Sequence, residues 1–205
     1  MIDHLVYGAP DLNDAVDRIK QLLGVRPASG GKHASRGTHN ALLSLGSGRY
    51  LEIIAPDPEQ PPPVMPRAFG LDTIKVPRLL TWAAKAPDIE STAEAARAAG
   101  YDPGAITPGS RDLPDGGRLQ WRLAYDPQRS GDGLVPFLID WQSEPHPSST
   151  APHGCMLLDL RGEHPDPESV GRMLAALNVD LQVEMGPRPV LIATIQCPDG
   201  TVELA

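Results

Sequence analysis

The chain has 205 residues, enough for one large domain or two small ones, and its hydrophobic fraction of 40% suits a soluble globular protein. A net charge of -8 argues against nucleic acid as a partner, because binding phosphates needs clustered Lys and Arg. The sequence has no run of about 18 apolar residues and does not open on a basic segment with an apolar stretch behind it. We therefore expect no membrane partner and a cytoplasmic location, with Cys155 and Cys197 as free thiols.

The first predicted element is a strand over residues 2–7, in which two sets of side chains alternate between opposite faces. A helix follows, with Asp11 as a suitable N-cap, apolar residues at helical spacing and Gly24 at its end. His4 lies on an apolar face of the strand. Because burying an imidazole costs free energy unless it is paired or bound, His4 is the first candidate for a functional site.

The next stretch, residues 29–40, is rich in glycine and is expected to form a loop or an irregular strand. Two strands are predicted after it, over residues 41–45 and 50–55, joined by a glycine-rich hairpin. Glu52 lies in the second of these strands, among apolar residues. A buried carboxylate also needs a partner, so Glu52 is the second candidate for the site.

The same order of strand, helix and strands recurs along the chain. The phrase APDIESTAEAARAAG, which begins at Ala86, echoes APDLNDAVDRIKQLLG, which begins at Ala9. A third round follows a second Pro-rich break, so the sequence predicts three βαβββ-like units. The predicted boundaries are a first module at residues 1–56, a Pro-rich linker at 57–77, a second module at 78–143, a linker at 144–154 and a third module at 155–205.

Three segments of the first unit, DHLVYGAPDL, GGKH with GTHN, and YLEIIAPDP, together resemble the glyoxalase-like branch of the vicinal oxygen chelate superfamily. The segment PFLIDWQ, residues 136–142, is similar to the end of the second module in that branch. The resemblance implies an α+β protein in which repeated βαβββ modules form curved mixed sheets around a pocket. The superfamily includes glyoxalase I, extradiol dioxygenases, fosfomycin-modifying enzymes and metal-free bleomycin-binding proteins, so the fold alone assigns no activity.

Metal-dependent members of the superfamily take ligands from the first and last strands of each module, which implies His4 and Glu52 as metal ligands here. An imidazole and a carboxylate suit one divalent ion, such as Zn, Ni, Mn or Fe, and His39 or His33 would supply the second His of a two-His, one-carboxylate iron site if the loop folds inward. In the second module the first-strand position falls near Thr81 or Trp82, neither of which is a ligand, while Glu203 aligns with Glu52 in the third. The alternative is a His–Glu pair that lines a pocket without any metal.

Other residues are expected to bind the substrate. His33, His39 and Asn40 belong to the Gly-rich stretch, whose backbone can approach a ligand closely. Tyr7 and Trp141 are candidates for pocket walls, with ordinary core packing as the alternative for both. The remaining histidines flank Pro-rich segments and are interpreted as surface residues: His146, His153 and His164.

Asp140 ends an apolar strand and, like Glu52, is a candidate for a catalytic base. One hypothesis is therefore a glyoxalase- or dioxygenase-like enzyme, a metal-dependent lyase, isomerase or dioxygenase acting on a small molecule around His4 and Glu52. A second is a metal-free protein of the bleomycin-resistance type that binds or sequesters a small ligand. A third is an interaction protein whose third module builds an interface, and the resemblance also predicts a homodimer.

Overall fold

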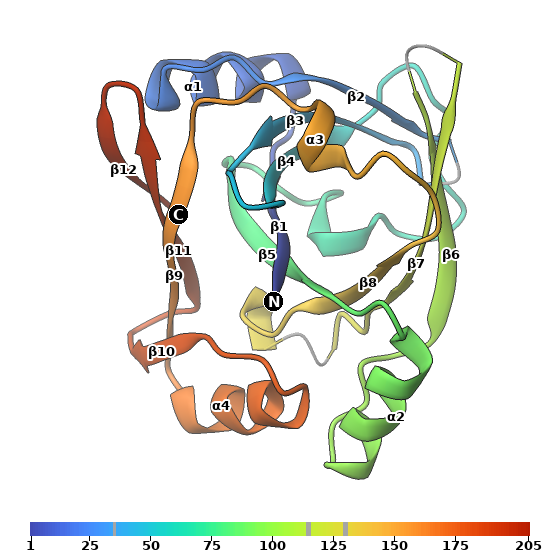
Figure 1. Ribbon diagram of the computed structural model, residues 1–205, viewed down its shortest axis with the longest axis vertical. Coiled ribbons are helices and arrows are strands. Elements are labelled where there is room, and N and C mark those ends of the chain that lie inside the picture. The colour runs from blue at the N-terminus through green and yellow to red at the C-terminus, as the bar shows by residue number, and fades with distance from the viewer. Residues whose placement is uncertain (35, 114–115, 129–130) are drawn as a thin grey trace.

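The structure is a computed structural model that describes residues 1–34, 36–113, 116–128 and 131–205. Two βαβββ modules form one body, and the C-terminal part adds a separate sheet beside it (Figure 1). The first module contains β1 (Ile2–Gly8), α1 (Leu12–Leu23), β2 (Ala28–His33), β3 (Thr38–Ser44) and β4 (Tyr50–Pro56). The second contains β5 (Arg78–Lys85), α2 (Ile89–Ala98), β6 (Ile106–Asp112), β7 (Arg118–Ala124) and β8 (Phe137–Trp141). The C-terminal part contains α3 (Pro147–Thr150), β9 (Met156–His164), α4 (Pro167–Ala176), β10 (Gln182–Met185), β11 (Val190–Cys197) and β12 (Gly200–Leu204).

The strands of the two modules close into a barrel in the order β1-β4-β3-β2-β6-β7-β8-β5. Within each module the first and last strands are parallel neighbours, and the modules meet where β1 runs antiparallel to β5. The barrel closes between β2 and β6 through the pairing of Lys32 with Asp112. The expected α+β architecture of curved mixed sheets is therefore confirmed.

Helix α1 forms where the sequence predicts it, because its capping signals are real. The Asp11 carboxylate accepts a hydrogen bond from the backbone N–H of Asp14 at 3.0 Å, and Gly24 ends the helix with a left-handed φ of 71°. The buried face of α1 packs against the outside of β3 and β4. The helix therefore covers one wall of the barrel and leaves the interior to the inward-facing strand residues.

Strand β4 shows how the barrel separates a cavity from the core. Tyr50, Glu52 and Ile54 point into the barrel, whereas Leu51 and Ile53 point outward into the main hydrophobic core. A strand alternates its side chains with a period of two, so one short segment serves both sides. The predicted face shared by Tyr50, Glu52 and Ile54 is the one that lines the cavity.

The Gly-rich stretch before β3 forms an irregular strand, one of the two predicted forms, and most of residues 29–40 belong to the antiparallel pair β2 and β3. The register shifts between Ser29 and Gly31, and Gly31 has a φ of 138° that favours glycine. Strand β6 was not predicted as an element at all. These irregular, polar strands lack the apolar alternation that identifies β1 and β4.

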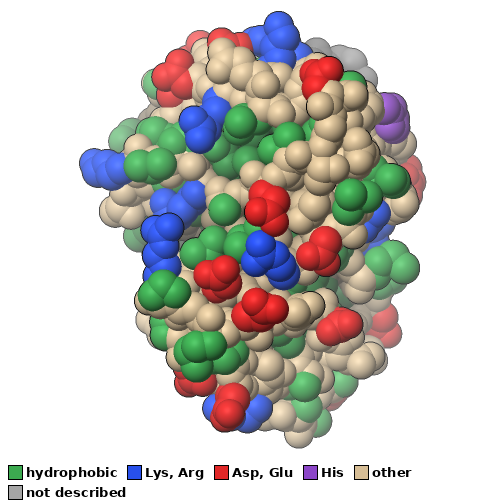
Figure 2. Space-filling model, turned by 90° about the vertical axis from the view of Figure 1, so that its left-hand side faces the viewer, with side chains coloured by type: hydrophobic (Ala, Val, Ile, Leu, Met, Phe, Trp, Pro, Cys, Tyr) green, Lys and Arg blue, Asp and Glu red, His purple; other side chains and the backbone are tan. Residues whose placement is uncertain are grey.

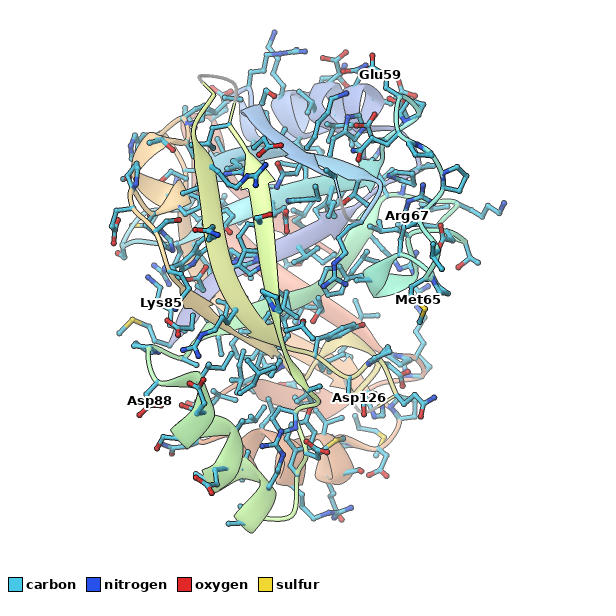
Figure 3. All side chains as sticks on the ribbon, turned by 90° about the vertical axis from the view of Figure 1, so that its right-hand side faces the viewer. Glu59, Met65, Arg67, Lys85, Asp88 and Asp126 are labelled. Atoms are coloured by element: carbon cyan, nitrogen blue, oxygen red, sulfur yellow. The ribbon has the colours of Figure 1, made fainter. Side chains whose placement is uncertain are left out.

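The Pro-rich residues 57–77, which we call the strap, run along one side of the barrel. Figure 3 labels Glu59, Met65 and Arg67 on this segment. The Arg67 guanidinium donates to the Gly37 carbonyl at 2.9 Å and pairs with Asp72 at 2.5 Å, which fixes the strap to the first module. A short 3-10 helix, Ala68–Gly70, then places the strap against the open side of the barrel cavity.

The C-terminal unit repeats the order of elements but not the pairing of the first two modules. Its sheet has the order β10-β9-β11-β12, with β9 and β10 as direct parallel neighbours, whereas β1 and β2 are separated by β4 and β3. Glu203 of β12 forms an exposed ion pair with Arg161 at 3.1 Å. The side of the molecule on which this sheet lies mixes acidic, basic and apolar side chains (Figure 2). None of the described helices is long and apolar enough to cross a membrane.

Candidate functional site

The interior of the barrel holds a cavity with about 790 Å³ of empty space, its opening included. Side chains from both modules and from the strap line it, and most of them are apolar. Most of the polar groups lie on the first module: His4 from β1, His33 from β2, Arg36, Thr38 from β3 and Glu52 from β4; Ser110 of β6 comes from the second. The aromatic walls are formed by Tyr50, Phe69, Trp121, Tyr125, Phe137 and Trp141.

The imidazole of His4 is oriented by its sequence neighbour Asp3. A register shift in β1 between Ile2 and His4 lets the two adjacent side chains meet, and Nδ1 of His4 donates to Oδ1 of Asp3 at 2.7 Å. In the neutral form of the ring, this hydrogen bond leaves Nε2 as the nitrogen without a proton. The ring stacks on Tyr50, with centroids 4.5 Å apart, which fixes its plane.

Asp3 is fully buried and gathers hydrogen bonds from three side chains. Besides His4, Nε2 of His146 donates to its Oδ2 at 3.1 Å and the indole N–H of Trp141 lies 3.3 Å from the same oxygen. Burial alone would raise the pKa of Asp3, but the hydrogen bonds from His146 and His4 outweigh it and hold the pKa well below the usual 3.8. Asp3 is therefore a permanent carboxylate at neutral pH.

Glu52 faces His4 across the polar end of the cavity, with Oε2 at 3.8 Å from Nε2 of His4. Its other oxygen accepts a hydrogen bond from Nδ2 of Asn40 at 2.5 Å, and Oδ1 of Asn40 accepts one from Nη1 of Arg111 at 2.9 Å. A Cβ atom on Gly30 would lie 2.2 Å from both Arg111 and Asn40. Glycine at that position therefore leaves room for the Arg111–Asn40–Glu52 chain.

His33 is a neutral member of the same cluster. Its Nδ1 lies 2.9 Å from the Thr38 hydroxyl, and its Nε2 lies 4.0 Å from Oε1 of Glu52. Burial lowers the pKa of His33 to about 4, although the charge of Glu52 opposes that shift. The imidazole is therefore uncharged at neutral pH, and it adds a polar edge to the cavity without adding charge.

The structure brings together five of the residues singled out in the sequence. His4, His33, Glu52 and Trp141 line the cavity, and Asn40 lies directly behind Glu52.

The other three predicted site residues lie away from the cavity. Tyr7 is buried in the main core, and His39 is half-buried with Nδ1 at 4.0 Å from Asp57. Asp140 accepts hydrogen bonds from Arg122 and from Gln142, on the face of β8 opposite to Phe137, Ile139 and Trp141.

Sequence reasoning missed Asp3, Arg111 and His146. Asp3 was assigned to the face opposite His4, and only the register shift in β1 brings the two together. His146 was interpreted as a surface residue, yet it reaches the buried Asp3 from a loop 143 positions away. No local pattern signals either contact, because both depend on how distant segments pack.

The pairing of β1 with β5 shows which positions of the two modules are equivalent. His4 pairs with Ala83 and Val6 pairs with Thr81, so exchanging the modules places Thr81 on His4 and Ala83 on Val6. His4 and Thr81 also precede the starts of α1 and α2 by the same number of residues. Thr81 is therefore the counterpart of His4.

The counterpart of Glu52 follows from the last strands. Glu52 lies two residues beyond Tyr50, the partner of His4. In the second module Ala83, two residues beyond Thr81, pairs with Phe137 in a parallel register. Phe137 therefore lies two residues beyond the position opposite Thr81. Phe137 therefore stands where the first module has Glu52.

The four equivalent positions hold His4, Glu52, Thr81 and Phe137, which do not fit the four-ligand metal site that the resemblance implied. A phenyl ring has no lone pair for a metal, and a Thr hydroxyl is a poor ligand beside imidazole and carboxylate. His33 is a further nitrogen donor: Thr38 binds its Nδ1, while its Nε2 lies 4.0 Å from Oε1 of Glu52. Within the described ranges, no group of three or more His, Cys, Asp and Glu side chains is placed to hold a metal ion. The side chains that line the cavity suit acid–base chemistry.

Removal of the two buried threonine hydroxyls is expected to affect the free energy of unfolding in different ways. Thr38 is hydrogen-bonded to His33, whereas the Thr81 hydroxyl has no partner among the described residues. We expect Thr38→Val to lower the free energy of unfolding by about 1–3 kcal/mol, because it leaves the imidazole unpaired. Thr81→Val should be neutral or stabilising. Urea unfolding of both variants tests the pair, and an equal loss in both would contradict the assignment.

A barrel of two βαβββ modules around a cavity with one polar end defines a protein of the vicinal oxygen chelate type. The profile of the glyoxalase-like domain family matches residues 2–178, so the chain belongs to that family. No curated protein matches the chain significantly.

Among solved structures, a hypothetical protein from Staphylococcus aureus superposes with a TM-score of 0.62 at 14% identity, covering 98% of this chain and 84% of that chain. The methylmalonyl-CoA epimerase from Mycobacterium tuberculosis has a TM-score of 0.45 at 19% identity, covering 70% of this chain and 88% of that chain. A Streptomyces coelicolor epimerase in complex with 2-nitronate-propionyl-CoA has a TM-score of 0.47 at 19% identity, covering 71% of this chain and 98% of that chain. Likeness at such identities concerns the fold alone.

Proposed function

We propose that this protein is an enzyme that moves a proton on a small, largely apolar molecule held in the barrel cavity. The observation that carries the proposal is the pair His4 and Glu52, whose Nε2 and Oε2 atoms lie 3.8 Å apart at the polar end of a ring-lined cavity. Each group is held from behind, His4 by Asp3 and Glu52 by Asn40. Such oriented pairs are typical of general acid–base catalysis.

In the proposed reaction, Glu52 takes a proton from one atom of the ligand and passes it to Nε2 of His4, which delivers the same proton to a second atom, so both groups end in their starting states. Asp3 keeps the proton of His4 on Nδ1, so Nε2 is available as a base, while Asn40 leaves Oε2 of Glu52 available. The aromatic walls exclude water from a ligand in the cavity, which strengthens the electrostatic interactions at the reacting atoms.

The placement of the pair also indicates which proton transfers are favoured. His4 and Glu52 both belong to the first module, and the counterpart positions hold Thr81 and Phe137. A proton removed by one base and returned by its neighbour stays on one face of the ligand. We therefore propose an isomerisation or tautomerisation, in place of an inversion that needs a base on each face.

Proton exchange in D2O tests this proposal without knowledge of the full reaction. A panel of small aromatic ketones, enols and α-hydroxy ketones would be incubated with the protein, and loss of C–H signals followed by proton NMR. We expect accelerated exchange for members of the panel, and a loss of about 100-fold or more in Glu52→Gln, the range typical of a general acid or base.

The matched control is His39→Asn, because His39 comes from the same stretch of chain and does not line the cavity. It should retain the wild-type exchange rate. Equal exchange in the wild type and Glu52→Gln, or loss of exchange in His39→Asn, would argue against the assigned pair.

A second function, binding without turnover, is favoured by one observation. Six aromatic side chains surround the cavity, an arrangement that suits retention of a flat ligand. This function predicts thermal stabilisation by ligands of the panel with no exchange and no product. A homodimer and a cytoplasmic location stay predictions from the sequence.

A further inference from the structure

A second hollow lies outside the barrel cavity, between the start of β5, the end of β7 and the turn before β11. Its empty space is about 1570 Å³, its open side included, and we call it the cleft. Its walls come from three parts of the chain that are remote in sequence: the strap, the second module and the C-terminal sheet. The cleft therefore exists only because the C-terminal unit is docked beside the barrel.

Two exposed arginines from different units line the cleft, Arg78 at the start of β5 and Arg188 in the turn before β11. Neither guanidinium makes an ion pair or a hydrogen bond with any residue that the structure describes. Both guanidinium groups therefore keep their donors for a ligand, as charge-assisted binding of an anion requires. The cleft is also lined by Asp132, whose carboxylate lies 3.2 Å from Nε2 of His164, and by Ala205.

Two aromatic rings separate the cleft from the barrel cavity. Phe69 and Tyr125 line both spaces, and their ring centroids lie 5.0 Å apart. Phe69 has a left-handed φ of 61°, a conformation that is rare and costly for a bulky residue. The cleft and the cavity are thus neighbours that share two lining residues, one of them on a strained turn of the strap.

Thr81 lies at the inner wall of the cleft. The residue is only 2% exposed, and its hydroxyl has no hydrogen-bond partner among the described residues. Because the hydroxyl is closed off from the cleft, the positively charged groups available to a ligand there are the arginines. As the counterpart of His4, Thr81 belongs to the half of the barrel that lacks the acid–base pair.

We propose that the cleft binds the anionic end of an elongated ligand, a phosphate or a carboxylate, between Arg78 and Arg188. The apolar end of the same ligand occupies the barrel cavity, and the chain of the ligand passes Phe69 and Tyr125. Arginine is suited to this role because its planar fork donates two parallel hydrogen bonds to either anion. The inference rests on the proposed function only for the apolar end.

The test compares probes that differ in the anion alone: phenylbutyl phosphate, phenylbutyrate and phenylbutanol. Intrinsic fluorescence reports entry of the phenyl group, because Trp121 and Trp141 line the cavity. Calorimetry with inorganic pyrophosphate reports the cleft by itself. The double variant Arg78→Ala, Arg188→Ala is matched by Arg18→Ala, Arg172→Ala, which removes the same charge from exposed helix positions.

We expect at least one anionic probe to bind about tenfold or more tightly than phenylbutanol, as charge-assisted hydrogen bonds imply. This advantage and pyrophosphate binding should be lost in Arg78→Ala, Arg188→Ala and retained in the matched control. Comparison of phosphate with carboxylate then identifies the anion.

Two results would overturn the proposal. One is equal affinity for the anions and the alcohol in the wild type. The other is an anion preference that survives in the double variant and disappears in Arg36→Ala, since Arg36 lies at the cavity itself. Absence of any fluorescence change, with pyrophosphate still bound through Arg78 and Arg188, would contradict the proposed function and leave the anion site standing.

Discussion

Replacing Asp3 by alanine should lower the free energy of unfolding by about 3–5 kcal/mol at pH 7, the range measured when one member of a buried charged network is removed. Asp3 is 0% exposed and accepts hydrogen bonds from His4 and His146, with the indole of Trp141 close by. The substitution leaves these donors buried without an acceptor. Urea unfolding followed by far-UV circular dichroism measures the change.

The control for Asp3 is Asp17→Ala. Asp17 forms an ion pair with Arg26 at 2.6 Å, but more than half of each side chain is exposed. Its loss should cost no more than about 1 kcal/mol, because water already screens such pairs. Comparable losses for the two variants would mean that the Asp3 network contributes no more than a surface pair.

Acidification from pH 7 to pH 4 should weaken the fold by about 3 kcal/mol through His33 alone. The unfolded imidazole takes up a proton below its ordinary pKa of 6.5, whereas burial lowers the folded pKa to about 4. Between these values the unfolded state binds more protons, so stability falls as the pH falls and levels off below pH 4. The full difference of about 2.5 pKa units is worth about 3.5 kcal/mol, of which about 3 kcal/mol is lost by pH 4.

The variant His33→Asn should remove this dependence, and urea unfolding at several pH values between 7 and 4 measures it. His153→Asn is the matched control, because His153 is exposed and outside the site. Titration of Asp3 contributes little to the change in stability between pH 7 and pH 4. Its pKa is lowered from 3.8, so the stability it provides is present above that pH and is lost only at more acidic values. An unchanged slope in His33→Asn would show that His33 is not buried as a neutral ring.

The elements that could be predicted were those with a strong local signal. The caps Asp11 and Asp88 mark the starts of α1 and α2, and the apolar alternation of β1 and β4 places His4 and Glu52 on inward faces. Strand alternation also limited the prediction for β8. Asp140 and Trp141 are adjacent, so only one of them can face the cavity, and the sequence does not say which one does.

Contacts between distant segments could not be predicted. The register shift that joins Asp3 to His4, and the loop that brings His146 to Asp3, depend on pairing and packing that no local pattern encodes. The C-terminal unit shows the same limit, because its order of elements repeats while β9 and β10 pair directly. Order along the chain predicts which elements form, and tertiary packing decides how they pair.

Whether His4 and Glu52 move protons themselves is tested most directly by the metal content of the purified protein. The measurement is elemental analysis after incubation with Zn, Ni, Mn and Fe and removal of free ions, with His4→Ala, Glu52→Ala alongside. Because the second module offers Thr81 and Phe137 at the counterpart positions, we predict no stoichiometric ion in either protein. About one ion per chain in the wild type, lost in the double variant, would contradict direct proton transfer and assign His4 and Glu52 as metal ligands.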